Sequence, residues 1–305
     1  MAEKKRVFCC GNVAYDIVIT KEDGDGGFCM EGCPGGAVFN TSVILGRLGL
    51  DVSLVSSLSD DFLADTLLEF MRRENISTSH VKRTNCVKTS LAIAHLDKKG
   101  DSSYIFYRDK DPETSLPVKR SLIKSFKKND VFHAGSIFSY ADPSFGSVLS
   151  LMKTARVKKM FSTYDPNWRD DRIKNKKIAR KRVREFFELA DLIRMSDTDA
   201  FGITEEKTIS SALKKLPGKT VLTLGKKGSF FWDGRKSTLC PAVKVKVVDT
   251  IGAGDAFTAG LIARYCLLGR DIFWKKMHDN LKFASKIAAR VCASRGATSA
   301  LKPQG

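Results

Sequence analysis

The residues best placed to do chemistry lie at positions 249–257, which read Asp-Thr-Ile-Gly-Ala-Gly-Asp-Ala-Phe. Glycines at 252 and 254 let the backbone turn sharply and let a ligand approach it closely. The backbone amides of Gly252, Ala253 and Gly254 would then face an anion at the start of a helix, where the helix dipole favours negative charge. Asp255, beside these amides, could accept a proton from a hydroxyl that attacks a phosphoryl group. The stretch therefore predicts phosphoryl transfer with Asp255 as the general base.

Asp255 also has a purely structural interpretation, because an aspartate in the first turn of a helix stabilises the helix end. Capping alone, however, does not require two glycines and a second aspartate, Asp249, ahead of it. We therefore favour the catalytic interpretation.

These residues need a framework, and the sequence predicts one of alternating strands and helices. A strand at 245–248 is expected to lead into the glycine turn, and a helix at 256–268 to follow it. Further strands are predicted at 7–10, 13–20, 50–55, 131–134, 159–163, 189–194, 220–224 and 229–232, and further helices at 37–48, 62–74 and 277–294. Such alternation is typical of an α/β fold whose mostly parallel central sheet is flanked by helices on both faces.

Two segments, 13–33 and 86–110, are rich in strand signals and lack helical periodicity. The runs 91–96 and 103–107 flank a turn sequence, Asp-Lys-Lys-Gly, and are predicted to form a hairpin. We expect the two segments to form a small β-sheet lid. No repeat or long linker divides the chain, so we expect a single domain over residues 1–305.

The composition is that of an ordinary globular protein, with 305 residues, 43% of them hydrophobic and 28% charged. No apolar run reaches the roughly 18–20 residues that cross a bilayer. Gly11, Asn12 and Asp16 interrupt the first apolar stretch, which argues against a signal peptide. We expect a cytoplasmic protein with no membrane partner. The eight cysteines and four histidines are dispersed, so the sequence predicts no zinc site.

The chain is strongly basic, with a net charge of +18 and a pI near 9.6. Such a charge would suit nucleic acid or an anionic substrate. Much of the excess lies between 169 and 184 and merges into an amphipathic helix from about 178. No aromatic residues for base stacking are interleaved with it, so we favour a solvated helix face and expect no nucleic-acid partner.

With the motif at 249–257, the chain resembles the ribokinase-like (phosphofructokinase-B-type) carbohydrate kinases, whose C-terminal signature is Asp-Thr-x-Gly-Ala-Gly-Asp-x-Phe. The N-terminal signature of that family, Gly-Gly-Ala-x-x-Asn before a helix ending in Leu-Gly, matches residues 35–40 and 46–49. Two signatures in the right order are far more specific than one. The resemblance covers essentially the whole chain and implies a ribokinase-like fold.

The resemblance implies a role for each matching residue. Asp255 matches the general base, and residues 252–254 match the anion hole. The remaining matches are Asp16, Gly35, Gly36 and Asn40 for the sugar, Thr223, Gly225 and Gly228 for the nucleotide, and Asp249 and Thr250 for a monovalent cation such as K⁺. Ser285 stands where an asparagine near the adenine is common, so the nucleotide preference could be relaxed.

Some of these residues also have purely structural interpretations. Asp16 lies inside the apolar run 13–19, where an unpaired carboxylate carries a desolvation cost, so we favour function over a turn or edge position. Asn40 could simply start a helix. Residues 223–228 could be an ordinary hairpin turn.

Two further segments narrow the range of substrates that the sequence predicts. Residues 165–169, Asp-Pro-Asn-Trp-Arg, and residues 105–108, Ile-Phe-Tyr-Arg, resemble segments of fructokinases and of ketodeoxygluconate kinases. Arg169 and Arg108 are thus expected to bind oxygens of the substrate or phosphate. As alternatives, Arg108 could be a solvated hairpin residue and Arg169 the start of the basic segment.

The chain departs from the family where an Asn-x-x-Glu segment helps to organise Mg²⁺ through water. Residues 196–199 read Ser-Asp-Thr-Asp here, so Asp199 would supply that carboxylate on a shorter arm. The residues after Arg108 also depart from the fructokinase pattern, which leaves the sugar open.

The sequence and the resemblance together predict an ATP- and Mg²⁺-dependent kinase that phosphorylates a ketohexose, with fructose favoured. A 2-keto-3-deoxygluconate or other sugar-acid kinase, or a ribokinase, is the alternative among enzymes. The alternative of another class is a non-catalytic sugar-sensing or nucleic-acid-binding protein on a kinase fold. A lid of this kind commonly becomes a dimer interface in the family, so we also expect a homodimer.

Overall fold

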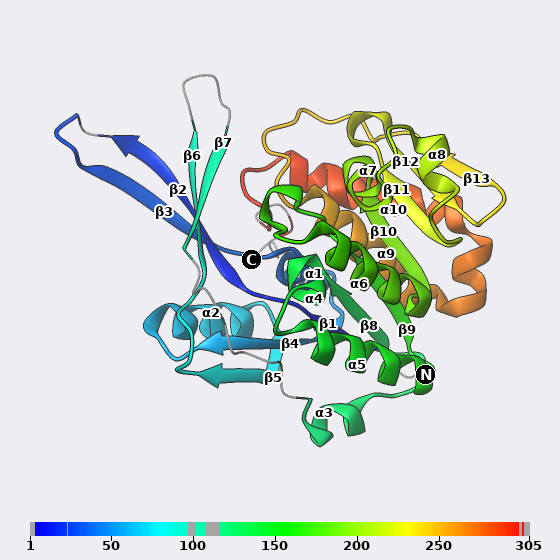
Figure 1. Cartoon of the computed structure of the whole chain (residues 1–305), viewed down its shortest axis with the longest axis horizontal. Coiled ribbons are helices and arrows are strands. Elements are labelled where there is room, and N and C mark those ends of the chain that lie inside the picture. The colour runs from blue at the N-terminus through cyan, green and yellow to red at the C-terminus, as the bar shows by residue number, and fades with distance from the viewer. Residues whose placement is uncertain are drawn as a thin grey trace.

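The computed structural model describes residues 4–22, 24–96, 102–107, 116, 118–298 and 301. A nine-stranded sheet forms its centre (Figure 1). In spatial order the strands are β13 (Ser237–Cys240), β12 (Ser229–Trp232), β11 (Thr220–Thr223), β10 (Leu192–Ser196), β9 (Phe161–Asp165), β8 (Val131–Gly135), β1 (Arg6–Cys10), β4 (Asp51–Ser59) and β5 (Ile76–Thr84). From β11 to β5 neighbouring strands run parallel, and only β12 and β13 are antiparallel to their neighbours. The α/β fold with a mostly parallel sheet is confirmed.

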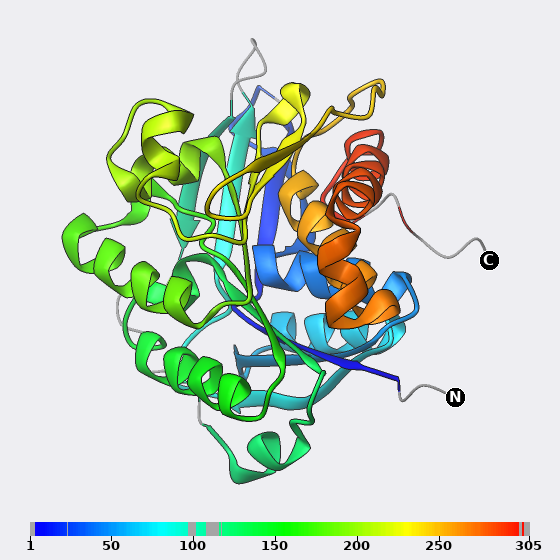
Figure 2. The same ribbon diagram turned by 90° about the vertical axis from the view of Figure 1, so that its right-hand side faces the viewer.

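Helices cover both faces of this sheet, as Figure 2 shows from the side. One face is covered by α1 (Ala37–Arg47), α2 (Phe62–Arg73), α9 (Ala253–Lys275) and α10 (Met277–Cys292). The buried residues on the other side come from α3 (Arg120–Ser125), α4 (Ser136–Tyr140), α5 (Phe145–Val157), α6 (Lys176–Leu189), α7 (Asp197–Thr204) and α8 (Ile209–Leu213). Two short 3₁₀ turns, η1 (Asp170–Arg172) and η2 (Gly225–Lys227), complete the helical elements.

The central strand β1 shows why the sheet is buried on both sides. Its side chains alternate, so Val7 and Cys9 enter one apolar cluster whereas Phe8 and Cys10 enter the other. Nearly continuous apolar strands of this kind are typical of parallel sheets between two helical layers. In the described part of the chain no helix combines the length and the apolarity needed to cross a membrane.

A second, four-stranded sheet extends away from the main body (Figure 1). Its strands are β3 (Phe28–Gly35), β2 (Ala14–Glu22), β6 (Leu91–Leu96) and β7 (Ser102–Tyr107), in that spatial order. The antiparallel pairing of β6 with β7 confirms the predicted hairpin, and the small sheet lies where the lid was expected. Among its side chains that the structure describes, Phe28, Met30, Ile105 and Tyr107 are large, apolar and exposed. The homodimer stays a prediction.

One predicted strand, 245–248, is wrong. The backbone there is irregular, because the amide of Val248 donates to the carbonyl of Cys292 at the end of α10 and pairs with no strand. The side chains of Val245, Val247 and Val248 are exposed, so this Val-Lys alternation covers no core. The real edge strand is β13, which the sequence did not single out.

Two other strands begin later than predicted. A turn at 158–159 follows the end of α5 at Val157, and α6 still includes Leu189, where the second strand was predicted to begin. The following strands β9 and β10 then begin at Phe161 and Leu192 instead of 159 and 189.

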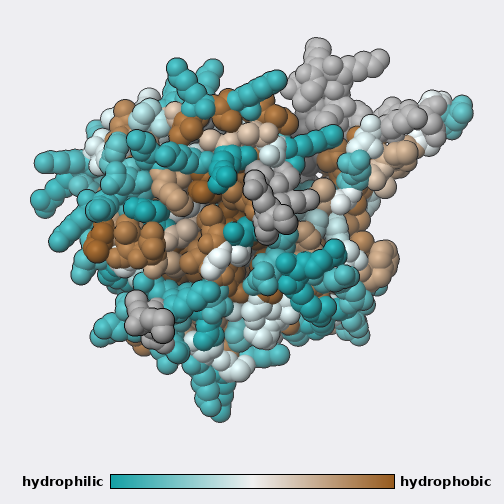
Figure 3. Space-filling view, turned by 180° about the vertical axis from the view of Figure 1, so that it is seen from behind, coloured by the Kyte–Doolittle hydropathy of each residue, from teal (hydrophilic) through white to brown (hydrophobic). Residues whose placement is uncertain are grey.

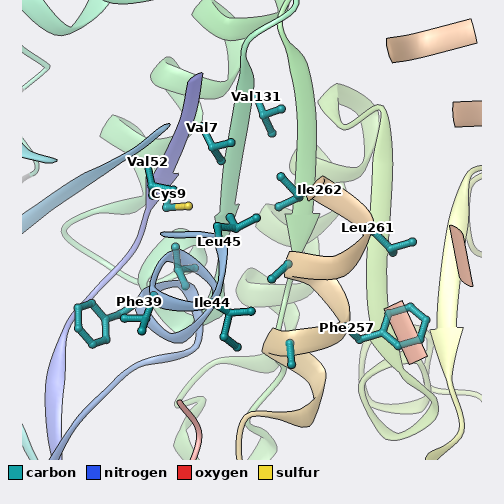
Figure 4. Close-up of a cluster of buried hydrophobic side chains, with 14 of the residues drawn as sticks. Val7, Cys9, Phe39, Ile44, Leu45, Val52, Val131, Phe257, Leu261 and Ile262 are labelled. Carbon is teal, nitrogen blue, oxygen red and sulfur yellow. The ribbon is translucent and has the colours of Figure 1, made fainter. Parts of the chain in front are cut away.

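Packing of α1 against α9 sets the relative position of their first turns, which carry Asn40 and Asp255. Figure 4 shows Ile44 and Leu45 of α1 on the side toward α9, whose Ile262 points toward the strands of the main sheet. Full burial of such a side chain contributes about 1.5–3 kcal/mol. Because α1 and α9 begin on the same edge of the sheet, their first turns lie close together.

Candidate active site

The glycine turn at the start of α9 has the geometry expected of an anion site. Gly252 is the N-cap residue with a φ of 78°, and a Cβ there would lie 2.6 Å from the Cβ of Ala297. Only glycine suits both that conformation and that space. The amide of Ala253 donates to the carbonyl of Thr250 at 3.2 Å. Within the described residues the amides of Gly252 and Gly254 have no hydrogen-bond partner, so two of the three predicted donors are free for a ligand.

Asp255 lies in the first turn of α9 and is 8% exposed. Its Oδ2 accepts a hydrogen bond of 2.8 Å from Nδ2 of Asn40, and its backbone carbonyl accepts one from Thr41. Burial raises the pKa of the Asp255 carboxyl to about 7, the hydrogen bond from Asn40 opposes this rise, and the charge of Asp165 adds to it. A carboxylate that titrates near neutral pH is well matched to general-base chemistry.

The predicted sugar-side residues lie around this carboxylate. Asn40, 4% exposed, spans from α1 to Asp255, and its Oδ1 is buried without a partner among the described residues. The Asp16 carboxylate covers Gly35 so closely that a Cβ on Gly35 would lie 2.1 Å from Asp16 Oδ2. Gly36 begins α1 with a φ of 118°, where a Cβ would lie 2.7 Å from the carbonyl oxygen of Asn12. The fold thus brings both signature segments to one place.

Of the two arginines predicted to bind the substrate, the structure describes Arg169. Arg169 is exposed, yet its positive charge lowers the pKa of both Asp16 and Asp255 against the effect of burial. Arg172, which the sequence analysis did not single out, lowers the pKa of Asp16 more than Arg169 does. Arg108 lies outside the described residues.

The main surprise is a buried polar network beneath the glycine turn. Arg194 in β10 pairs with Asp165 at 3.0 Å and donates to Thr223 at 2.6 Å, while Thr258 of α9 donates to Asp165 at 3.0 Å. The guanidinium also lies against Gly254, where a Cβ would be 2.5 Å from Arg194 Nη1. A side chain at residue 254 would therefore displace the Arg194 guanidinium, which is held by Asp165 and Thr223.

A sequence signal for this network exists. Arg194 is a single charge inside the strand sequence Leu-Ile-Arg-Met-Ser, whose apolar neighbours are buried. A charge in such a strand requires a partner, because an unpaired buried charge costs several kcal/mol. The partner itself, Asp165, could not be identified without the fold.

Asp199 is buried, but its geometry is that of a helix cap. Its side chain accepts from the amide of Ser196 at 2.9 Å and its amide donates to Ser196 Oγ, which closes a capping box at α7. Burial raises the pKa of Asp199, and the charge of Asp165 adds to the rise. The described residues hold no group of three or more His, Cys, Asp or Glu placed for a metal ion. The water-mediated Mg²⁺ role of Asp199 stays a prediction.

The predicted nucleotide side lies at the ends of β11 and β12. Thr223 ends β11 and is held by Arg194, and the turn after it contains Gly225 and Gly228. A Cβ on Gly228 would lie 2.2 Å from the carbonyl oxygen of Cys240. Ser285 of α10 is buried, and its hydroxyl lowers the pKa of the Cys240 thiol against the effect of burial. Thr223, Gly225 and Gly228 lie at or next to the turn between β11 and β12. Their roles in nucleotide binding, and that of Ser285, stay predictions.

Asp249 organises the turn that precedes α9. Its carboxylate accepts from the amides of Ile251 at 2.9 Å and Gly296 at 2.8 Å. Thr250 beside it is exposed. The two amides give Asp249 a structural function, and the cation role of both residues stays a prediction.

Part of the basic segment takes part in surface ion pairs. Three cations of α6 are paired, namely Lys176 with Asp170, Arg180 with Glu205 and Arg182 with Asp142. Arg182 also lies over the ring of Phe145 at 4.5 Å. Figure 3 shows the face of the molecule opposite that of Figure 1, on which polar side chains surround apolar patches. The absence of a nucleic-acid partner stays a prediction.

Comparison with known proteins places this site in a family. A family model described as pfkB family carbohydrate kinase matches residues 4–304. The probable fructokinase-7 of Arabidopsis thaliana is 30% identical over 312 residues, which cover 97% of this chain and 89% of the relative. A fructokinase of Vibrio alginolyticus is 25% identical and covers 98% of this chain and 96% of its own.

Solved structures of two kinases have the same fold as this chain. A fructokinase from Vibrio cholerae O395, in a fructose, ADP and calcium ion bound form, superposes with a TM-score of 0.84 at 24% identity over 98% of this chain and 96% of the other. An aminoimidazole riboside kinase from Salmonella enterica, complexed with aminoimidazole riboside and an ATP analog, gives a TM-score of 0.82 at 20% identity over 97% and 96%. The ribokinase-like arrangement of main sheet and separate small sheet is thereby confirmed.

Proposed function

Since the chain belongs to the pfkB family of carbohydrate kinases, we propose that it transfers the γ-phosphoryl group of ATP to a hydroxyl of fructose. One observation carries the proposal. The hydrogen bond from Asn40 to Asp255 joins the sugar-side signature to the phosphate-side signature in a single buried site.

The reaction assigns a task to each group. Asp255 accepts the proton of the attacking sugar hydroxyl, for which its raised pKa and its place beside the glycine turn suit it. The amides of Gly252 and Gly254 stabilise negative charge that develops on the phosphoryl group. Asp16 and Asn40 orient the sugar, and the lid sheet closes over it to exclude water.

A divalent metal ion, when bound, neutralises charge on the phosphates. Asp199 is the residue that we expect to hold it through water, with Asp165 close by. Mg²⁺ is usually held by one or two carboxylates together with the phosphates of the nucleotide, so a site without a cluster of protein ligands fits it. Asp249 and Thr250 are expected to lie near a monovalent cation.

The choice among sugars is tested by ADP release with a panel of fructose, 2-keto-3-deoxygluconate and ribose. We expect the highest kcat/KM for fructose, since relatives that match most of this chain are fructokinases. A higher kcat/KM for the sugar acid would replace fructose with the alternative substrate. Release of ADP with none of the sugars would contradict the proposed activity.

The pH dependence follows from the pKa of Asp255. A general base must be deprotonated, and burial raises the pKa of this carboxyl to about 7. The value of kcat/KM should therefore be low at pH 5, rise through about pH 7 and level off above it. Initial rates at fixed ionic strength measure this profile, and a flat profile between pH 5 and 8 would contradict the role of Asp255.

A further inference from the structure

Two polar side chains without a role in the proposed reaction, those of Asn12 and Ser136, contact each other. They lie at the edge of the main sheet that carries the candidate active site. Cys10 of β1 pairs with Ala134 of β8, and Asn12 and Ser136 each follow two residues later. Ser136 Oγ donates a hydrogen bond to Asn12 Oδ1 at 3.1 Å. The pair thus bridges the ends of two neighbouring strands, near α1 and α4 (Figure 1).

The pair lies next to the predicted sugar side. The carbonyl oxygen of Asn12 is the atom that a Cβ on Gly36 would approach to 2.7 Å. Gly36 begins the helix that carries Asn40, and Gly35 before it lies under Asp16. On its other side the pair adjoins Gly135, whose missing Cβ leaves room for the carbonyl oxygen of Asp165.

The backbone of Ser136 is unusual. It has a φ of 58° although it is not glycine, and it is 7% exposed. Non-glycine residues in this region are uncommon, and they concentrate at functional sites where the side chain is needed. Glycine would adopt the same conformation without strain, so the conformation alone does not account for serine.

The hydrogen-bonding capacity of the pair matches one sugar hydroxyl. When Ser136 donates to Asn12, its oxygen keeps lone pairs that can accept a bond. The bond from Ser136 uses only the amide oxygen of Asn12, so the two N–H donors of this half-buried side chain can still serve a ligand. A hydroxyl group can donate to the serine oxygen and accept from the asparagine nitrogen at the same time.

We propose that Asn12 and Ser136 together bind a hydroxyl of the sugar and help to determine which sugar is accepted. The inference rests on the proposed function, because it requires a sugar in this site. It adds to the proposed sugar contacts a pair of residues that lie outside both signature segments.

The test compares Ser136→Ala with Ser136→Gly. Both variants remove the hydroxyl, but only glycine relieves the backbone strain. If the hydroxyl binds the sugar, both variants should raise the KM for fructose by roughly tenfold, as loss of about one hydrogen bond implies, with the KM for ATP unchanged. Asn12→Asp, which keeps an acceptor for Ser136 and removes the amide donors, should raise the KM for fructose similarly.

A purely structural role gives a different pattern. In that case Ser136→Gly would keep the wild-type KM for fructose while Ser136→Ala lowers the thermal midpoint, and this result would overturn the inference. Wild-type KM values in all three variants would overturn it as well.

Monodeoxy analogues of fructose identify the hydroxyl that is bound. For one analogue the loss in kcat/KM seen with the wild type should vanish in Ser136→Gly, since both changes remove the same hydrogen bond. Losses that simply multiply for every analogue would contradict the contact. A wild type inactive on all sugars overturns the proposed function and this inference together, whereas an active wild type with unaffected variants overturns the inference alone.

Discussion

Asp255→Asn is expected to lower kcat by about 10²–10⁴-fold, the range typical of a lost general base. The amide has nearly the same shape and can keep a contact with Asn40, but it cannot take the proton of the attacking hydroxyl. Substrate binding should therefore survive, with KM values for sugar and ATP close to those of the wild type. Steady-state kinetics at pH 8, where the wild-type carboxyl is ionised, measure the effect.

The matched control for this variant is Asp271→Asn, in the second part of α9 beyond the non-helical residue Gly269. Asp271 is exposed and lies far along α9 from the glycine turn, so the same chemical change there should leave kcat unchanged. A kcat for Asp255→Asn within a factor of two or three of the wild type would contradict the assignment of the base.

Arg194→Met is expected to lower the free energy of unfolding by about 3–5 kcal/mol, because the buried carboxylate of Asp165 loses its cation. The side chains of this pair are 11% and 7% exposed, so little water screens them. Loss of the guanidinium also removes the contact against Gly254, so activity should fall as well. Urea unfolding followed by circular dichroism measures the stability.

A second variant separates the charge effect from the loss of packing. Arg194→Met combined with Asp165→Asn leaves no unpaired charge, so the double variant should be more stable than Arg194→Met alone. Exposed Arg184 on α6 serves as control, and Arg184→Met should change stability by less than about 0.5 kcal/mol. An unchanged urea midpoint in Arg194→Met would contradict the structural role of the pair.

Local sequence patterns predicted most of the fold because strand and helix periods are local properties. The helix over Ala37–Arg47 and the strand over Ser229–Trp232 were predicted to within a residue. The strand predicted at 245–248 failed because alternating valine and lysine indicates only that one face could be buried. Whether a neighbouring strand exists to pair with it depends on distant parts of the chain.

The candidate site likewise has a part that local sequence predicts and a part that depends on contacts between distant segments. The glycine turn and Asp255 were recognisable within one short stretch, since their chemistry depends on consecutive residues. The contact between Asn40 and Asp255 spans 215 positions, and the family resemblance gave each residue a role without predicting that they touch. The pairing of Arg194 with Asp165 and the bridge from Ser136 to Asn12 join separate strands, so no local pattern predicts them.

The most direct test of the proposed activity is transfer of label from [γ-³²P]ATP to fructose by the purified protein. The account predicts labelled fructose phosphate in equal amount to the ADP formed with the wild type, and almost none with Asp255→Asn. Labelled inorganic phosphate without labelled sugar, or equal labelling by Asp255→Asn, would contradict it.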